Sequence, residues 1–276
     1  MKTARALVVL FFGMLVQASL FSQTVDFLVV SKSHTYTQTD NSTTVDTANP
    51  FTFEAHVEGS GDLSGAAVTL TKPSGTGSTT MAYNAGGDKW GIKTSFADQT
   101  SLDAAYGNGN YSLTAFGQTV NPISVTGDIY PSSAPLAILS GGTISGGVLN
   151  WDVSQSLTIT LNGTANHMGI NINGQSYNVN PETFGGTTLS VTINPGDMVA
   201  GNTYNVELDF DNIVGGTIGN YGGTGAMAAA QYAGVYNTST FFTINAIPEP
   251  STYAAIFGVV ALAGVMIYRR RRMQVA

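Results

Sequence analysis

The densest group of oxygen-bearing side chains in the sequence is Asp209, Asp211 and Asn212, which follows an alternating apolar run. Calcium prefers several carboxylate and carbonyl oxygens, so these three residues are the candidate metal ligands. A pair of aspartates at the end of a strand more often forms a turn, because their side chains accept hydrogen bonds from nearby backbone amides. The turn is the favoured interpretation, and no metal or other cofactor is assigned.

A second group of chemically able side chains is centred on His56, with Glu54 and Glu58 two positions away on either side. Successive side chains of a strand alternate between its faces, so these three share one face. They would make a weak metal patch, but a solvated strand face is the favoured interpretation. His34 and His167 are distant in sequence, and no His-Glu-x-x-His or His-x-His pattern occurs, so a zinc site has little support.

Motifs of hydrolytic enzymes are missing from the sequence. There is no Gly-x-Ser-x-Gly elbow and no phosphate-binding loop, and the absence of cysteine excludes thiol nucleophiles, disulfides and Cys-ligated zinc. Glu182 and Glu207 carry carboxylates, but glycoside hydrolysis needs two carboxyl groups about 5 to 9 Å apart in space. We therefore predict no catalytic residue and no enzyme. Two carboxylates meeting in a concave pocket would favour the alternative, a secreted carbohydrate-active or other hydrolase.

The elements that must position these residues are short strands. Threonine or serine alternates with apolar residues in seven runs, which places one face in a core and the other in water. Pairs rich in Gly, Asn and Asp separate the runs, as hairpins and loops require. The runs are residues 51–57, 67–70, 111–116, 156–161, 188–193, 204–210 and 240–244. The pattern predicts an all-β, antiparallel fold.

A short pattern that occurs twice in the sequence predicts two domains. Tyr111 and Tyr204 each follow a glycine-containing turn and open an alternating strand, 93 residues apart. This spacing is about the length of one immunoglobulin-like β-sandwich, in which a tyrosine at the start of a late strand bonds back to the preceding corner. Two unrelated Gly-Tyr turns are the alternative. We expect tandem β-sandwich domains at residues 24–126 and 136–245, joined by a linker at 127–135.

The charge of the chain is divided between its middle and its ends. Residues 23–247 hold four lysines against 16 acidic residues, a formal charge of −12. No lysine or arginine occurs between Lys93 and Arg269. Binding to nucleic acid depends on clustered cationic side chains, so this balance argues against it.

The N-terminus has the three-part order of a secretory signal. Lys2 and Arg5 precede an apolar stretch at residues 6–16, and small residues follow at Ala18, Ser19 and Ser22. Cleavage after Ala18 or Ser22 is expected, so residues 1–22 are predicted to be a signal peptide. A buried N-terminal helix is the alternative interpretation. The body of the protein is therefore expected outside the cytoplasm.

The C-terminal segment is predicted to be a membrane-spanning helix. Residues 251–268 contain no charge, and 18 helical residues extend about 27 Å, close to the thickness of a hydrocarbon core. Pro248 and Pro250 prevent the helix from extending upstream. The basic cluster that follows should stay cytoplasmic by the positive-inside rule. It consists of Arg269, Arg270, Arg271 and Arg272.

The stretch Ile247-Pro248-Glu249-Pro250, the apolar span and the terminal arginines together closely resemble the PEP-CTERM sorting signal of exported proteins in Gram-negative bacteria. The resemblance is confined to residues 247–276. It implies recognition by an exosortase, an integral-membrane enzyme resembling cysteine transpeptidases, which processes the protein near the motif. Pro248, Glu249 and Pro250 match the recognition motif, and the four arginines match the stop-transfer cluster. An accidental proline linker before a plain anchor is the alternative.

Together these features predict an exported surface or extracellular-matrix protein. It would be a single-pass inner-membrane protein with its body outside, and would reach the cell surface or medium after processing. Its role would be structural, adhesive or glycan-associated, with an exopolysaccharide or another surface protein as partner. The sequence does not identify a ligand for the β domains.

Overall fold

The computed structural model describes residues 23–46, 48, 50–85, 89–174 and 177–273, without the side chains at 215–217, 250–253, 269 and 271–273. The predicted signal peptide, residues 1–22, lies outside the described residues. The strands are β1 (Thr24–Gln38), β2 (Thr43–Val45), β3 (Phe51–Ser60), β4 (Thr69–Thr71), β5 (Ser78–Thr80), β6 (Ala82–Asn84), β7 (Lys89–Phe96), β8 (Gly109–Ala115), β9 (Gln118–Val125), β10 (Ala137–Leu139), β11 (Ile144–Ser145), β12 (Val148–Asp152), β13 (Leu157–Asn162), β14 (His167–Gly174), β15 (Tyr177–Val179), β16 (Glu182–Phe184), β17 (Thr188–Ile193), β18 (Thr203–Asn220) and β19 (Gln231–Ile247). The helices are α1 (Gln99–Ala105), α2 (Pro250–Met273) and the 3-10 turns η1 (Leu63–Ala66), η2 (Pro73–Gly75) and η3 (Gly225–Met227).

The predicted all-β class is confirmed, and each of the seven alternating runs overlaps a strand. In β17, Leu189, Val191 and Ile193 point toward a core, whereas the threonines and serine between them point outward. The same alternation in β13 and β3 gives each strand one apolar face. Burial of these faces is what turns a polar, glycine-rich chain into packed sheets.

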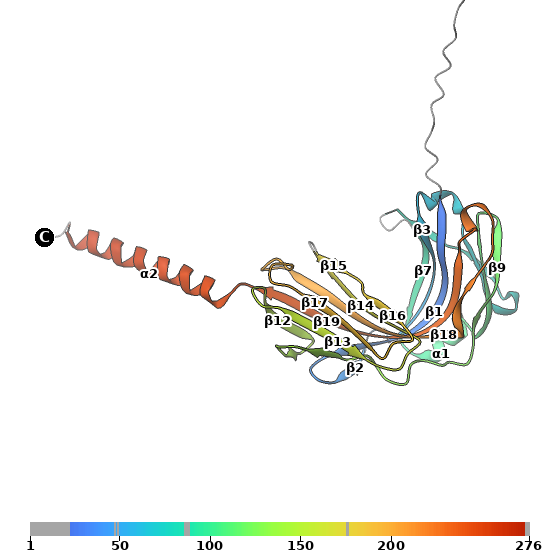
Figure 1. Ribbon diagram of the computed structural model, residues 1–276, viewed down its shortest axis with the longest axis horizontal. Coiled ribbons are helices and arrows are strands. Elements are labelled where there is room, and N and C mark those ends of the chain that lie inside the picture. The colour runs from blue at the N-terminus through green and yellow to red at the C-terminus, as the bar shows by residue number, and fades with distance from the viewer. Residues whose placement is uncertain (1–22, 47, 49, 86–88, 175–176, 274–276) are drawn as a thin grey trace, which may run out of the picture.

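One large sheet runs through the whole body of the molecule (Figure 1). Its main strand order is β15-β14-β18-β19-β1-β3-β7-β6. β1 lies between two strands of opposite sense, since it pairs parallel with β19 and antiparallel with β3. Two smaller sheets, β5-β4-β8-β9 and β10-β13-β17, complete the architecture.

Both hydrophobic cores lie on the same face of the large sheet. The first, against the four-stranded sheet, contains Phe53 and Leu113, and the second, against the three-stranded sheet, contains Ile159 and Leu208. β19 belongs to both cores, because its side chains near the start join the first core and those near its end join the second. The opposite face of the large sheet is therefore left for polar residues.

The two expected sandwich domains, residues 24–126 and 136–245, share one large sheet. There are two sandwich-like cores, but β18 and β19 run from one to the other within a single sheet, and β1 pairs with β19 over eleven positions. Residues 127–135 connect β9 to β10 beside this continuous sheet. The reason is strand length: β18 and β19 have 18 and 17 residues, far more than the five or six that one sandwich needs.

Each of the two tyrosines that suggested two domains forms a hydrogen bond with the backbone of the preceding turn. Tyr111 is fully buried and its hydroxyl donates to the carbonyl of Gly107 at 2.7 Å. Tyr204 is equally buried and its hydroxyl accepts from the amide of Val199 at 2.8 Å. Each tyrosine thus ties the start of its strand to the preceding turn, as in a tyrosine corner.

Replacing either tyrosine with phenylalanine is expected to lower the free energy of unfolding by about 1–2 kcal/mol, because a part-buried hydrogen bond to the backbone is lost while packing is kept. Urea unfolding of Tyr111→Phe and Tyr204→Phe measures the change. Tyr268→Phe, at a side chain 61% exposed on α2, is the control. Equal stability of all three variants would contradict a role for the two corners.

The C-terminal segment is helical, and α2 extends from Pro250 through the arginines to Met273. It projects away from the sheets (Figure 1). Its apolar side chains are exposed, including Phe257 at 72% and Val259 at 68%. Among the residues that the structure describes, no helix reaches the length and hydropathy of a membrane span.

Candidate functional site

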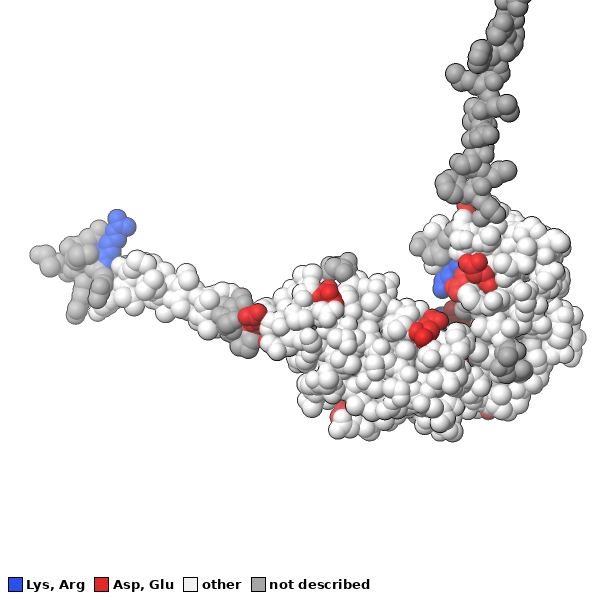
Figure 2. Space-filling model, viewed as in Figure 1, with Lys and Arg blue, Asp and Glu red and all other residues white. Residues whose placement is uncertain are grey.

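The candidate site is a groove on the open face of the large sheet. Side chains that alternate with the core residues of β1, β3, β14, β18 and β19 line a cavity of about 380 Å³. In Figure 2, acidic side chains gather where the molecule is hollowed between its two lobes. The carboxylates that line the groove come from Glu54, Glu58, Glu182, Glu207, Asp209 and Asp211. Lys93 is the only lysine or arginine among the described residues of this lining.

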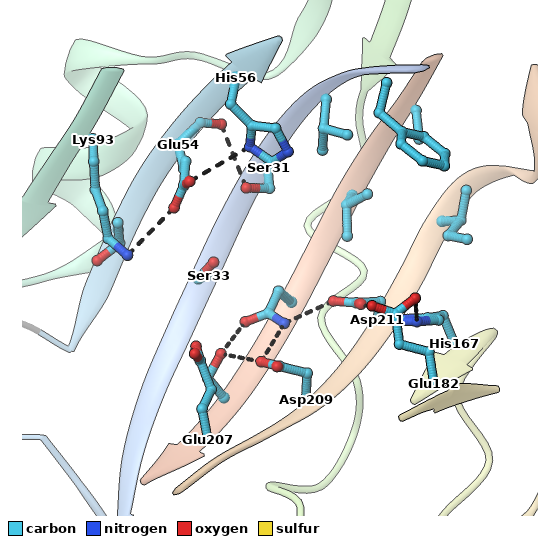
Figure 3. A pocket seen from close by; sticks show the side chains of 18 of the residues that line it. Ser31, Ser33, Glu54, His56, Lys93, His167, Glu182, Glu207, Asp209 and Asp211 are labelled. Carbon is cyan, nitrogen blue, oxygen red and sulfur yellow. Dashed lines mark hydrogen bonds and ion pairs between the residues drawn. The ribbon is translucent and has the colours of Figure 1, made fainter. Parts of the chain in front are cut away.

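His167 lies at one end of the groove between two carboxylates (Figure 3). Its Nδ1 is 2.6 Å from an Asp211 oxygen, and its Nε2 is 3.5 Å from a Glu182 oxygen. Burial acts to lower the pKa of His167, but the hydrogen bond to Asp211 and the charges of both carboxylates outweigh it, so the pKa is raised. The imidazolium form is therefore favoured here, and it neutralises part of the acidic lining.

Asp209 occupies the middle of the groove on β18. It accepts hydrogen bonds from Ser239 Oγ at 2.7 Å and from Asn237 Nδ2 at 3.1 Å. The same Asn237 nitrogen donates to Asp211 at 2.7 Å, so one amide holds two carboxylates together. Burial raises the pKa of Asp209 to about 8, and the charges of Glu207 and Asp211 act in the same direction. The carboxyl is thus largely protonated at neutral pH.

Glu54 lies across the groove on β3. Its two oxygens are 3.4 Å from His56 Nδ1 and 3.3 Å from Lys93 Nζ. The contact with His56 is the main cause that lowers the pKa of Glu54 to about 2, and the charge of Lys93 also contributes. The groove therefore combines a fixed negative charge at Glu54 with a largely neutral acid at Asp209.

Apolar rings complete the lining. Phe184 on β16 is 59% exposed, and its ring centroid is 4.6 Å from that of His167. Phe27 on β1 and Phe241 on β19 also line the cavity. Exposed rings beside hydrogen-bonding groups are typical of small-molecule and glycan-sized sites, because the rings supply area and the polar groups fix orientation.

The structure revises the predicted oxygen cluster. Asp209, Asp211 and Asn212 lie within β18 and not in a turn at a strand end, because the strand continues to Asn220. Asp209 and Asp211 face the groove, whereas the Asn212 amide donates to the carbonyl of Ile129 at 2.6 Å. Asp209 and Asp211 are therefore brought together, but the Asn212 side chain, the third candidate calcium ligand, is not with them. Within the described part of the chain, no group of three or more histidine, aspartate or glutamate residues has an arrangement that would hold a metal ion.

The prediction that Glu54, His56 and Glu58 share a non-core face is confirmed, but this face lines the groove. Sequence reasoning missed His167 and Lys93, and it set Glu182 and Glu207 aside. A signal was available for His167: Met168, Ile170 and Ile172 alternate as a strand core, which places His167 on the opposite face. No such signal places β14 beside β18.

No protein-family model matches the chain, and no curated protein matches it. Among solved structures, 51 chains match. One is the human OSCAR ligand-binding domain, at 10% sequence identity and a TM-score of 0.21, with 68% of this chain and 92% of that chain covered. An overlap at this score transfers neither a finer fold assignment nor a function to this chain.

Proposed function

We propose that this chain is an exported surface or extracellular-matrix protein that binds an extracellular glycan through the acidic groove. The groove itself is the observation that carries the proposal: a cavity of about 380 Å³ in which carboxylates, an amide, hydroxyls and aromatic rings converge from β1, β3, β16, β18 and β19. These groups match the many hydroxyls and apolar faces of a sugar chain. The role is adhesive or structural.

The charge of the groove limits the class of glycan that it can bind. Six carboxylates and one lysine repel an anionic polysaccharide, even with Asp209 protonated and His167 charged. A neutral glycan, or one that carries amino groups, is therefore the expected partner. Its amino groups would lie near Glu54, whose lowered pKa keeps it ionised.

Binding is tested with oligosaccharides of three charge types: chito-oligosaccharides with free amines, neutral glucan oligomers and anionic uronic-acid oligomers. Isothermal titration should detect the first two and not the third. Phe184→Ala is expected to weaken binding about tenfold, since an exposed ring that stacks on a ligand contributes on the order of 1–2 kcal/mol. Ile138→Ala, at a similarly exposed apolar residue outside the groove lining, is the control. Equal binding by both variants, or a preference for the anionic oligomer, would contradict the proposal that the groove binds a neutral or amino-bearing glycan.

For the C-terminus we propose a sorting tail of the PEP-CTERM type that tethers the body to the inner membrane until an exosortase processes it. The motif Pro248-Glu249-Pro250, the exposed apolar surface of α2 and the arginines behind it support this proposal. The predicted span, residues 251–268, includes three residues whose side chains lie outside the description. The predicted signal at residues 1–22 would place the body outside.

Substituting the motif tests the sorting proposal. The double variant Glu249→Gln, Pro250→Ala is expected to accumulate in the membrane fraction of the native host, because the processing enzyme no longer recognises the extended segment. In the processed fraction, the intact mass of the wild-type protein should correspond to a chain that ends near Pro250. Glu58→Gln, at an acidic residue of the groove, is the control for loss of a single charge. An unchanged distribution of the double variant would show that the motif is a plain linker.

A hydrolase on this scaffold is the second candidate. Its support is a group of neighbouring carboxyl groups, whose proximity could not be predicted from the sequence. Asp209 and Asp211 both accept a hydrogen bond from the Asn237 amide, and the charge of Glu207 acts on Asp209. A protonated acid beside an ionised one is the pairing that glycoside hydrolysis uses. Release of reducing ends from the bound oligosaccharide, abolished in Asp209→Asn, would favour it over simple binding.

A further inference from the structure

Lys32 is a fully buried lysine in the first core. It lies on β1 at the position where the alternation of Leu28 and Val30 calls for an apolar residue, and its side chain is 0% exposed. Its cross-strand neighbours are Phe53 on β3 and Tyr236 on β19, both also 0% exposed. The amine is therefore held away from water between two aromatic side chains.

Two side chains meet this amine. Lys32 Nζ lies 2.5 Å from Asp103 Oδ1 in α1, and 2.6 Å from Asn108 Oδ1 in the loop before β8. Asn108 Oδ1 also accepts a hydrogen bond from the Tyr236 hydroxyl at 3.0 Å. The Asn108 Nδ2 group donates to Asp128 at 2.7 Å. Both ends of the amide are thus fixed, and its carbonyl carbon is one bond from the oxygen that the amine contacts.

We propose that Lys32 and Asn108 form an intramolecular isopeptide bond. Lys32 gives a proton to Asp103, and the neutral amine attacks Cγ of Asn108. A bond forms between Nζ and Cγ, and the carbonyl electrons move onto Oδ1. The bond between Cγ and Nδ2 then breaks as the carbonyl re-forms. Asp103 carries two protons in turn from Nζ to the leaving nitrogen, which departs as ammonium, and Asp103 returns to its ionised form.

Each neighbour has a part in this step. The Tyr236 hydroxyl points at the oxygen where negative charge develops, as an oxyanion donor must. Burial raises the pKa of Tyr236 to about 12, so the hydroxyl keeps its proton. Asp128 holds the nitrogen that leaves. Asp103 is 31% exposed, which gives the ammonium a route to solvent.

The bond would close the segment from residue 32 to residue 108 and join β1 to the loop that leads into β8. A crosslink of that span restricts the unfolded chain as a disulfide does. The sequence has no cysteine, so this bond would supply a covalent staple that a disulfide cannot. The inference concerns the first core, and it stands or falls separately from ligand binding in the groove.

Mass spectrometry of the full chain, purified in detergent and denatured, tests the bond. Loss of one ammonia lowers the mass by about 17 Da. Cyclisation of an N-terminal Gln23, or of Asn108 onto the backbone of Gly109, causes the same loss, so the assignment rests on a branched peptide. Proteolysis and fragmentation should show the segment containing Lys32 joined to the segment containing Asn108. Unmodified Lys32 in a linear peptide from the folded wild type would overturn the proposal.

Variants separate the bond from the other ammonia losses. Lys32→Met and Asp103→Asn should each lack the branched peptide, because one removes the nucleophile and the other the proton carrier. Lys72→Met is the matched control: Lys72 Nζ donates to the carbonyl of Ala105 at 2.9 Å and lies over the Tyr106 ring. It should keep the branched peptide. If a variant fails to fold, the wild-type peptide map still decides the question.

Discussion

Replacing Gly234 with alanine is expected to lower the free energy of unfolding by about 3 kcal/mol or more. Gly234 lies in β19 where the large sheet meets β9 of the four-stranded sheet. A Cβ atom built there would be 1.8 Å from the carbonyl oxygen of Ser124 and 2.8 Å from its carbonyl carbon. These are backbone atoms that no rotamer change can move aside, so the two sheets must separate locally.

Gly91→Ala is the matched control for Gly234→Ala. Gly91 is also a strand glycine, in β7, but its Cβ would meet only the carbonyl oxygen of Ala55, at 3.8 Å. That is ordinary van der Waals contact, and the change in stability should stay within about 0.5 kcal/mol. Urea midpoints of the two variants measure the difference. A Gly234→Ala protein as stable as Gly91→Ala would mean that β9 does not pack this closely on β19.

Asp209→Asn is expected to stabilise the protein by about 2–4 kcal/mol at pH 8 and to have little effect at pH 4. The folded-state pKa of Asp209 is raised to about 8, mainly because the carboxyl is buried. Asparagine keeps the acceptor for Ser239 and Asn237 but has no charge to bury.

The sign of this pH effect follows from proton binding. Between about pH 4 and pH 8 the folded chain holds a proton on Asp209 that the unfolded chain has released, so wild-type stability falls as pH rises through that window. His167 acts in the same direction: its raised pKa gives stability that is complete below its unfolded value and is lost as pH rises through the folded value. Urea unfolding from pH 4 to pH 9 measures both contributions.

Asp211→Asn is the counterpart for Asp209→Asn, and it is expected to destabilise the protein at low pH, where Asp209→Asn has little effect. Asp211 lies 2.6 Å from His167, so removing its charge destabilises the imidazolium and lowers stability below about pH 6.5. If both variants shift stability in the same direction at every pH, the two carboxyls do not differ as the structure indicates.

The strands could largely be predicted from sequence, because threonine alternating with apolar residues is a local signal. The run at residues 188–193 coincides with β17, and the run at 156–161 is displaced from β13 by one residue. The pairing of strands that are far apart in the sequence could not be predicted. Nothing in residues 24–38 indicates that β1 pairs with a strand about 200 positions later, and this pairing is what merges the two expected domains into one sheet.

The candidate sites show the same limit. The face on which Glu54, Glu207 or Asp209 lies follows from alternation along its own strand. Their meeting in one groove depends on the order of β14, β18, β19, β1 and β3, which is a property of the whole fold. Lys32 could have been noticed, because it occupies an apolar position of β1, but its partners Asp103 and Asn108 come from a helix and a loop.

The parallel pairing of β1 with β19 also determines when the protein can fold. A ribosome adds roughly 5–20 residues per second, so β1 is made about 10–40 s before β19, its partner in the register from Phe27↔Gln231 to Thr37↔Phe241. During that interval one edge of β1 has no strand to pair with, and the large sheet cannot close. The large sheet can therefore be completed only after β19, close to the end of the chain, has been synthesised.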